Sequence, residues 1–129
     1  MKNVFFFLLS FAVYQLVGQP SNNNPKEAFA KMTFATTTVD YGIISKGSEP
    51  TRTFNFKNTG NAPLLITDAK ASCGCTVPTF PKDAIMPGES SAITVRYDTN
   101  RIGVISKSIT ITSNAGEPVV LKITGEVKS

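Results

Sequence analysis

Both cysteines of this 129-residue sequence lie in the segment Ala71-Ser-Cys-Gly-Cys-Thr-Val-Pro78, where only Gly74 separates Cys73 from Cys75. In an extended strand, alternate side chains lie about 6.6 Å apart on one face, the outer limit for a disulfide unless the glycine bends the chain. Closing so short a ring would stabilise the fold by only about 1.6 kcal/mol. A disulfide here is therefore expected to be strained, easily reduced and better suited to thiol exchange than to support.

Two other roles for this thiol pair stay open. Two thiolates on one face could hold a soft metal ion such as Cu(I), but a zinc site needs four ligands. The sequence has no histidine and no further cysteine to complete one. Alternatively, Cys73 and Cys75 are small side chains at the end of a strand, with one or both packed into the core. We expect no metal-ligating residue and no cofactor.

The remaining residues lack the groups on which most enzymes depend. Histidine is absent, which excludes Ser-His-Asp and Cys-His catalysis and removes the commonest general base. Ser72 lies in no Gly-x-Ser-x-Gly segment. Four aspartates fall in separate turns or strand ends, where turn formation explains them: Asp40, Asp68, Asp83 and Asp98. We expect no catalytic residue and predict that the protein is not an enzyme.

The cations are scattered singly, and the formal net charge is +4. This arrangement offers no stripe that would follow the phosphates of a nucleic acid. Arg52, Arg96 and Lys107 are expected at outward or strand-edge positions, where charge discourages edge-to-edge aggregation. No cation is nearer in sequence to the thiols than Lys70, although folding could bring Lys82 or another cation close enough to lower a thiol pKa.

The first 18 residues have the layout of a secretory signal peptide. Lys2 precedes an uncharged apolar run over residues 4–17, about 14 residues against the ~20 needed to span a bilayer. We expect cleavage after Gly18, no stable membrane insertion afterwards, and a periplasmic or secreted protein. Residues 19–31, with two prolines and three consecutive asparagines, are expected to form a flexible linker. Residues 32–128 then form one domain.

From residue 32 onward the hydrophobic pattern has a period of two, which is typical of half-buried strands. Phe54 and Phe56 alternate with polar neighbours, and further inward positions are expected at Ile93, Val95, Tyr97, Ile105, Ile109, Ile111, Val119, Leu121 and Ile123. Turn signals separate these runs at residues 58–61, 86–89, 100–103 and 114–117. The predicted fold is all-β, an immunoglobulin-like antiparallel β-sandwich of seven or eight strands, with a small closed barrel as the alternative.

Several of these segments occur together in one known family. They are Val39-Asp-Tyr-Gly42, Phe54-Asn-Phe-Lys-Asn-Thr-Gly60, Cys73-Gly-Cys-Thr76, Pro87-Gly88 and Ile109-Thr-Ile-Thr-Ser-Asn114. Over roughly residues 34–127 the chain resembles the bacterial domain-of-unknown-function family 1573. The resemblance implies an immunoglobulin-like fold of the PapD and Hydin type and export by bacteria with an outer membrane. It implies no established activity.

Together these observations predict an exported, non-catalytic binding or structural module of the bacterial envelope. A sandwich exposes edge strands, whose free N–H and C=O groups can accept another extended segment. We therefore expect a protein or peptide partner in the envelope, and no nucleic acid. The alternative function is thiol–disulfide or Cu(I) handling through Cys73 and Cys75.

Overall fold

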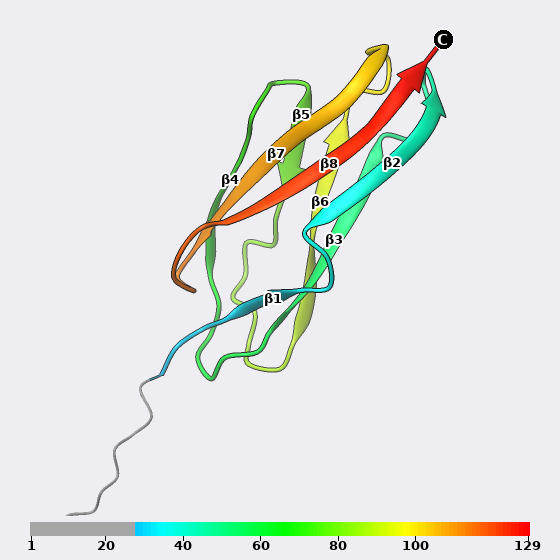
Figure 1. Ribbon diagram of the computed structural model, residues 1–129. Helices are drawn as coiled ribbons and strands as arrows, with labels where there is room; N and C mark the ends of the chain where they lie inside the picture. Colours follow the sequence, from blue (N-terminus) through cyan, green and yellow to red (C-terminus); the bar gives the residue numbers. More distant parts are fainter. Residues whose placement is uncertain (1–27) are drawn as a thin grey trace, which may run out of the picture.

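The computed structural model describes residues 28–129. These residues form eight strands, which pack as two sheets face to face (Figure 1). The strands are β1 (Met32–Phe34), β2 (Thr38–Ser45), β3 (Thr51–Asn58), β4 (Ile66–Ala71), β5 (Thr76–Thr79), β6 (Ser90–Tyr97), β7 (Gly103–Ser113) and β8 (Val119–Lys128). The predicted all-β sandwich is confirmed. No helix among the described residues is long and apolar enough to cross a membrane.

Each sheet has four strands. The first sheet has the order β1-β3-β6-β5, and the second has the order β2-β8-β7-β4. Neighbouring strands are antiparallel with one exception, because β2 runs parallel to β8. The period of two reports which side chains point inward but not the direction of the neighbouring strand, so the alternation could not predict this parallel pair.

The core lies between the two sheets and is built by the inward-facing residues of the long strands. Phe54 of β3 pairs with Ile93 of β6, and Ile109 of β7 pairs with Leu121 of β8. All four side chains are fully buried. Of the inward positions expected from the alternation, only Val119 is half-buried and the others are buried. The predicted register of these strands is therefore confirmed.

The loops gather at two opposite ends of the sandwich (Figure 1). The disulfide end carries the β2–β3, β4–β5 and β6–β7 loops, and β8 finishes there. The Asn58 end carries the β3–β4, β5–β6 and β7–β8 loops together with residues 28–31. The two names are used below in this sense.

Asn58 is a fully buried polar residue that ties together the end named after it. Its Oδ1 accepts hydrogen bonds from the N–H groups of Gly60 at 3.0 Å and Lys31 at 3.3 Å. Its Nδ2 donates to the carbonyl oxygens of Ala62 and Ile85, each at 2.8 Å. Every polar atom of the amide is satisfied, which is what a buried polar group requires.

The segment just before β1 packs against this cluster. The Asn61 N–H donates to the Phe29 carbonyl at 2.8 Å, and the Thr59 N–H donates to the Lys31 carbonyl at 2.9 Å. Residues 29–31, expected in the linker, are thus hydrogen-bonded to the β3–β4 turn. The expected signal peptide, residues 1–18, and residues 19–27 of the expected linker lie outside the described residues.

Candidate functional site

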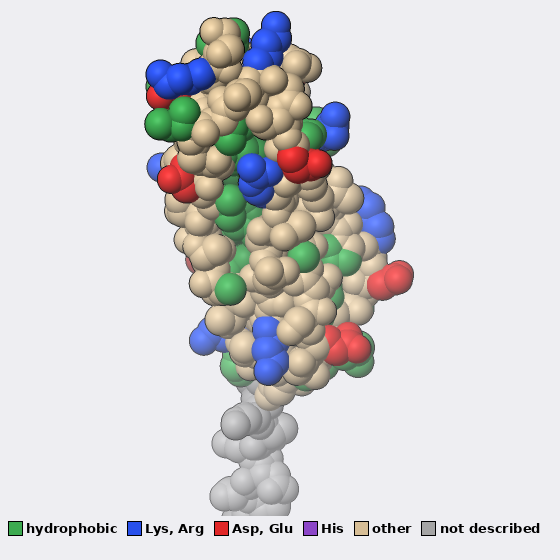
Figure 2. Space-filling view, turned by 90° about the vertical axis from the view of Figure 1, so that its right-hand side faces the viewer, with side chains coloured by type: hydrophobic (Ala, Val, Ile, Leu, Met, Phe, Trp, Pro, Cys, Tyr) green, Lys and Arg blue, Asp and Glu red, His purple; other side chains and the backbone are tan. Residues whose placement is uncertain are grey.

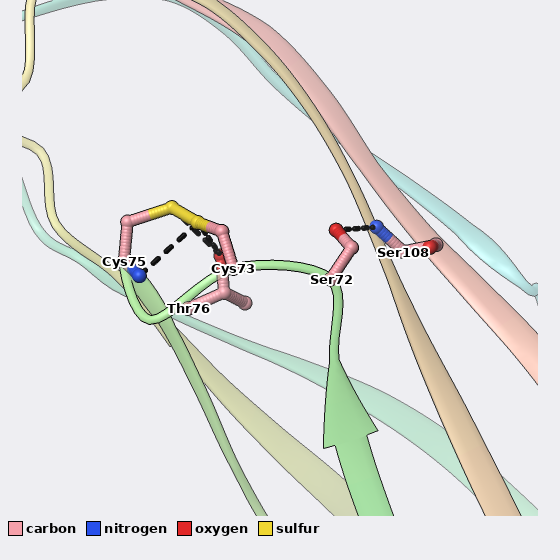
Figure 3. The surroundings of a disulfide bond; sticks show 5 residues. All are labelled: Ser72, Cys73, Cys75, Thr76 and Ser108. Carbon is pink, nitrogen blue, oxygen red and sulfur yellow. Dashed lines mark hydrogen bonds between the residues drawn. A yellow bond between two sulfur atoms is a disulfide. The ribbon is translucent and has the colours of Figure 1, made fainter.

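Cys73 and Cys75 are joined in a disulfide, in the turn that carries the chain from β4 in one sheet to β5 in the other (Figure 3). Their Cα atoms are 5.3 Å apart, closer than the about 6.6 Å of an extended strand. The turn at Gly74 brings them together, because the chain bends there before β5 begins. A disulfide in this sequence required a bend at Gly74, and the structure has that bend.

The two sulfur atoms have different surroundings. Cys75 is buried in the core, at 9% exposure, whereas Cys73 is half-buried at its margin. The Cys75 amide N–H donates to Cys73 Sγ at 3.1 Å. The Thr76 hydroxyl oxygen lies 3.6 Å from Cys75 Sγ and 4.0 Å from Cys73 Sγ. Cys73 is thus the more exposed residue of the pair, and its Sγ accepts a backbone hydrogen bond.

Hydrogen bonds hold this turn in place on both sides of the disulfide. Before it, the Ser72 N–H donates to the Ser108 carbonyl at 2.9 Å, and the Ser108 N–H donates to Ser72 Oγ at 3.1 Å; the second bond is drawn in Figure 3. After it, the Asp98 N–H donates to the Cys75 carbonyl at 2.9 Å. The position of the turn therefore does not depend on the sulfur–sulfur bond alone.

A hollow of about 510 Å³ opens beside the disulfide. The β2–β3 loop, the β4–β5 turn at Gly74 and Cys75, and residues 98–101 of the β6–β7 loop line it. Two arginines, Arg96 and Arg101, lie on the lining. Neither is near the cysteines in sequence, so the period-two hydrophobic pattern could not predict that they would lie beside the disulfide.

The walls of the hollow are bonded to each other. The Thr99 hydroxyl donates to the Ser48 carbonyl at 2.7 Å, and the Gly47 N–H donates to the Thr99 carbonyl at 3.1 Å. Asp98 caps its own turn, because its Oδ1 accepts the Asn100 N–H at 3.0 Å. Turn formation thus explains Asp98, as the sequence predicted.

Other cations are placed differently from what the sequence predicted. Arg52 was expected at an outward or strand-edge position, but its Cα partner is the buried Val95 and its guanidinium lies 4.2 Å from the centre of the Tyr41 ring. Lys107 was expected in the same kind of position, yet it shares the inner face of β7 with Ile109 and is half-buried. The alternation itself assigns both residues inward, so charge was a misleading guide there.

Arg96 is exposed, as expected. Lys82, which folding could have brought to the thiols, instead lies 3.8 Å above the Phe80 ring and is not part of the lining. Within residues 28–129 no group of three or more Cys, His, Asp or Glu side chains is arranged to hold a metal ion. The chemistry gathered at this end is thus a disulfide, two arginines and Asp98.

Tyr41 is buried in the core below the β2–β3 loop of this end. Its hydroxyl donates to the Pro50 carbonyl at 2.7 Å, and its ring meets the Tyr97 ring edge-on at 6.1 Å between centres. Burial raises the pKa of Tyr41 above its ordinary value, and the nearby Arg52 opposes that rise. Tyr41 therefore stays a neutral hydrogen-bond donor at ordinary pH.

A second hollow, of about 630 Å³, lies on the outer face of β1, β3 and β6. Small side chains such as Ser90 and Ala92 form much of its lining, and Lys57 supplies a charge. It brings together no sulfur, acid or hydrogen-bond network comparable to the first hollow. The disulfide end is therefore the stronger candidate for chemistry.

No curated protein matches this sequence. The solved structures that share its fold include the following three. A protein of unknown function from Porphyromonas gingivalis W83 has a TM-score of 0.67 and 19% identity over 77% of this chain, which spans 47% of that protein. PapD-like domain 7 of human CEP192 has a TM-score of 0.63 and 6% identity, covering 91% of this chain and 99% of its own. The YadV chaperone has a TM-score of 0.58 and 14% identity, and the match covers 77% of this chain and 53% of the chaperone.

At these identities the likeness shows the fold alone, and it agrees with the PapD type that the resemblance implied. The chain spans about half of the length of the Porphyromonas protein. A family model described as "Protein of unknown function (DUF1573)" matches residues 32–127, which is most of the chain and includes every strand from β1 to β7 and nearly all of β8. The chain belongs to the DUF1573 family.

Proposed function

We propose that this chain is an exported, non-catalytic binding module of the bacterial envelope, which captures an extended segment of a partner protein along the free edge of β2. One observation carries the proposal. β2 lies at the edge of the second sheet and leaves Ile43 exposed to 74%. An edge strand offers unpaired N–H and C=O groups, to which a segment of another protein can add as a further strand.

The four edge strands differ in how well they resist such addition. β1 has three residues, and β5 contains Pro78, which has no N–H to donate. β4 presents Asp68 and Lys70 and shifts register beside Asp68. Short strands, proline and charge all discourage strand addition. β2 has eight residues, of which only Asp40 is charged, so it is the least protected edge.

A register shift between Asp40 and Ile43 limits the part of β2 that can accept a partner. After it, residues 43–45 pair regularly with residues 126–128 of β8. The accepting segment is therefore short, and apolar contacts have to contribute to affinity. This requirement directs attention to the side chains around Ile43.

Two exposed apolar side chains, Ile43 and Val104, lie on either side of Glu126 on the outer face of the second sheet. Ile43 is the Cα partner of Glu126, which in turn is the partner of Val104. Val104 is 72% exposed. On the opposite face of β2, Val39 and Ile44 are half-buried against the core. Figure 2 views the side of the sandwich nearest β2 and β3, where hydrophobic side chains lie along the middle among scattered charges. A partner strand on β2 would thus find apolar contacts on both faces.

Two further observations support this proposal. The YadV chaperone shares the fold, and a protein so named acts on other proteins. The layout of residues 1–18 is that of a signal peptide, which supports export. Protein produced with its own leader should begin near Gln19 when intact mass is measured in the envelope fraction. Retention of residues 1–18 in that fraction would contradict the export part of the proposal.

Site-specific photo-crosslinking tests the binding part. A photoreactive amino acid is placed at position 43, at position 104 or, as the control, at position 120, in the full chain produced in a bacterium with an outer membrane. Val120 is also an exposed valine of the second sheet, at 51%, but β8 carries it near the Asn58 end. We expect protein adducts at positions 43 and 104. In the variant with the photoreactive residue at position 104, the further substitution Ile43→Lys should abolish the adduct. Equal adducts at position 120, or none at position 43, would refute the proposal.

A further inference from the structure

The two sulfurs of the disulfide at the β4–β5 turn have different surroundings, and a disulfide that only stabilises the fold does not need this asymmetry. Cys73 Sγ lies at the margin of the core and accepts the Cys75 N–H at 3.1 Å, whereas Cys75 is buried beside the Thr76 hydroxyl. A hydrogen bond from a backbone amide stabilises a thiolate. Opening of the disulfide would therefore place the more stable and more accessible thiolate at Cys73.

Charges around the turn act in the same direction. Arg96 and Arg101 line the hollow that Gly74 and Cys75 border. Lys107 lies on the inner face of β7, one residue from Ser108, which is hydrogen-bonded to Ser72. Asp98 is the opposing charge on the lining, and its carboxylate accepts the Asn100 N–H. On the lining itself, Arg96 and Arg101 outnumber Asp98, and this positive surrounding favours the thiolate over the thiol.

The turn is also held independently of its sulfur–sulfur bond. The Ser72–Ser108 pair fixes its beginning, and the bond from the Asp98 N–H to the Cys75 carbonyl fixes its end. Both flanking strands pair with long central strands, β4 with β7 and β5 with β6. Breaking the disulfide therefore leaves the two sulfurs facing one another in a folded protein.

We propose that Cys73–Cys75 is a thiol–disulfide exchange site, which oxidises one dithiol of a partner protein per chain, stoichiometrically, when the partner docks at the disulfide end beside the hollow that Cys75 borders. A partner thiolate attacks Cys73 Sγ, forms a mixed disulfide with it and breaks the Cys73–Cys75 bond. The electron pair of that bond leaves on Cys75 Sγ, which takes up a proton. The second partner thiolate then attacks the partner's own sulfur and releases Cys73 as a thiolate. The partner gains a disulfide, and its two electrons reside on the Cys73 thiolate and the Cys75 thiol.

Single-cysteine variants of the full chain test which sulfur exchanges. Cys75→Ser leaves Cys73 and its backbone donor, and Cys73→Ser leaves the buried Cys75. Each folded variant is incubated with oxidised glutathione at neutral pH, and the mixed disulfide is followed by mass spectrometry. We expect the adduct to form about tenfold faster on Cys73 than on Cys75, because Cys73 is the more exposed residue and its sulfur accepts a backbone hydrogen bond. Equal rates, or a faster reaction at Cys75, would overturn the proposal.

A second measurement tests the surroundings and does not depend on the relative exposure of the two sulfurs. The pH dependence of the glutathione reaction is recorded for Cys75→Ser alone and with Arg96→Gln, Arg101→Gln or both. Loss of these cations should move the midpoint to higher pH. Lys82→Gln is the matched control, because Lys82 lies over Phe80 outside the hollow. A midpoint that the arginine variants leave unchanged, or that Lys82→Gln shifts equally, would overturn the role assigned to the hollow.

Discussion

The two ends of the sandwich each enclose one chemically distinctive feature, and they treat it in opposite ways. At the Asn58 end, all four hydrogen-bonding positions of a buried amide are used by backbone groups of the surrounding turns. At the disulfide end, Cys73 lies at the margin of the core, and its partner Cys75 borders a hollow of about 510 Å³. From this comparison we expect the Asn58 end to serve stability, and the disulfide end to tolerate reduction of its sulfur–sulfur bond with the fold retained.

Replacing Asn58 should produce the largest effect. Asn58→Ala removes all four hydrogen bonds of the amide: the half-buried Ala62 carbonyl and Gly60 N–H lose this partner, and the buried Ile85 carbonyl keeps only the Leu64 N–H. We expect the free energy of unfolding to fall by about 2 to 4 kcal/mol, measured by urea denaturation. Asn55→Ala, on the exposed face of the same strand, is the control and should change little. A small loss for Asn58→Ala would show that the comparison overrates this end.

Glycine substitutions compare the two ends directly. A Cβ at Gly60 would lie 2.3 Å from the Phe29 carbonyl oxygen, whereas a Cβ at Gly74 has nothing within 4 Å. Gly60→Ala should therefore cost about 1 to 3 kcal/mol and expose the amides of residues 29–31 to hydrogen exchange. Gly74→Ala should cost well under 1 kcal/mol by the same measurement. If Gly74→Ala were the more destabilising of the two, the turn would be less tolerant than its open surroundings indicate.

Reduction of the disulfide should have a smaller effect. The loop-closure relation assigns about 1.6 kcal/mol to a ring of three residues, and the hydrogen bonds on either side of the turn remain. Thermal melting with and without a reductant, with thiol counting to confirm the redox state, measures the change. A loss well above that figure would make the disulfide a structural staple and would remove the contrast between the ends.

Tyr41 should give the smallest change, and one that depends on pH. Burial raises the pKa of Tyr41 in the folded state above its ordinary value of 10.0, so folding favours the protonated phenol. The associated stability is complete below pH 10 and is lost as pH rises through the raised pKa. Tyr41→Phe removes the bond to the Pro50 carbonyl and should cost about 1 kcal/mol at pH 7. Denaturation from pH 8 to 11 should show a shallower alkaline loss in the variant than in the parent protein.

The sequence predicted much of the fold because a period of two is a local property. Phe54, Ile93 and Ile109 are buried as expected, since each strand has one face against the core. Asn58 was missed, because an asparagine before Thr-Gly also marks an ordinary turn and nothing local shows that its amide is buried. Arg96 and Arg101 lie in the same hollow as Cys75 because of which strands pair. Such pairing joins distant residues, so no short pattern contains it.

The parallel pairing of β2 with β8 has a consequence for the order of folding. Thr38 pairs with Lys122, although the two residues lie near opposite ends of the domain's sequence. In the sheet, β8 lies between β2 and β7. The first sheet needs residues only as far as Tyr97, but the second cannot close before the last strand is available. Contacts so distant in sequence form slowly, because their loop entropy is lost before any pairing is gained. A nascent chain would therefore keep β2 unpaired until synthesis of the domain is complete.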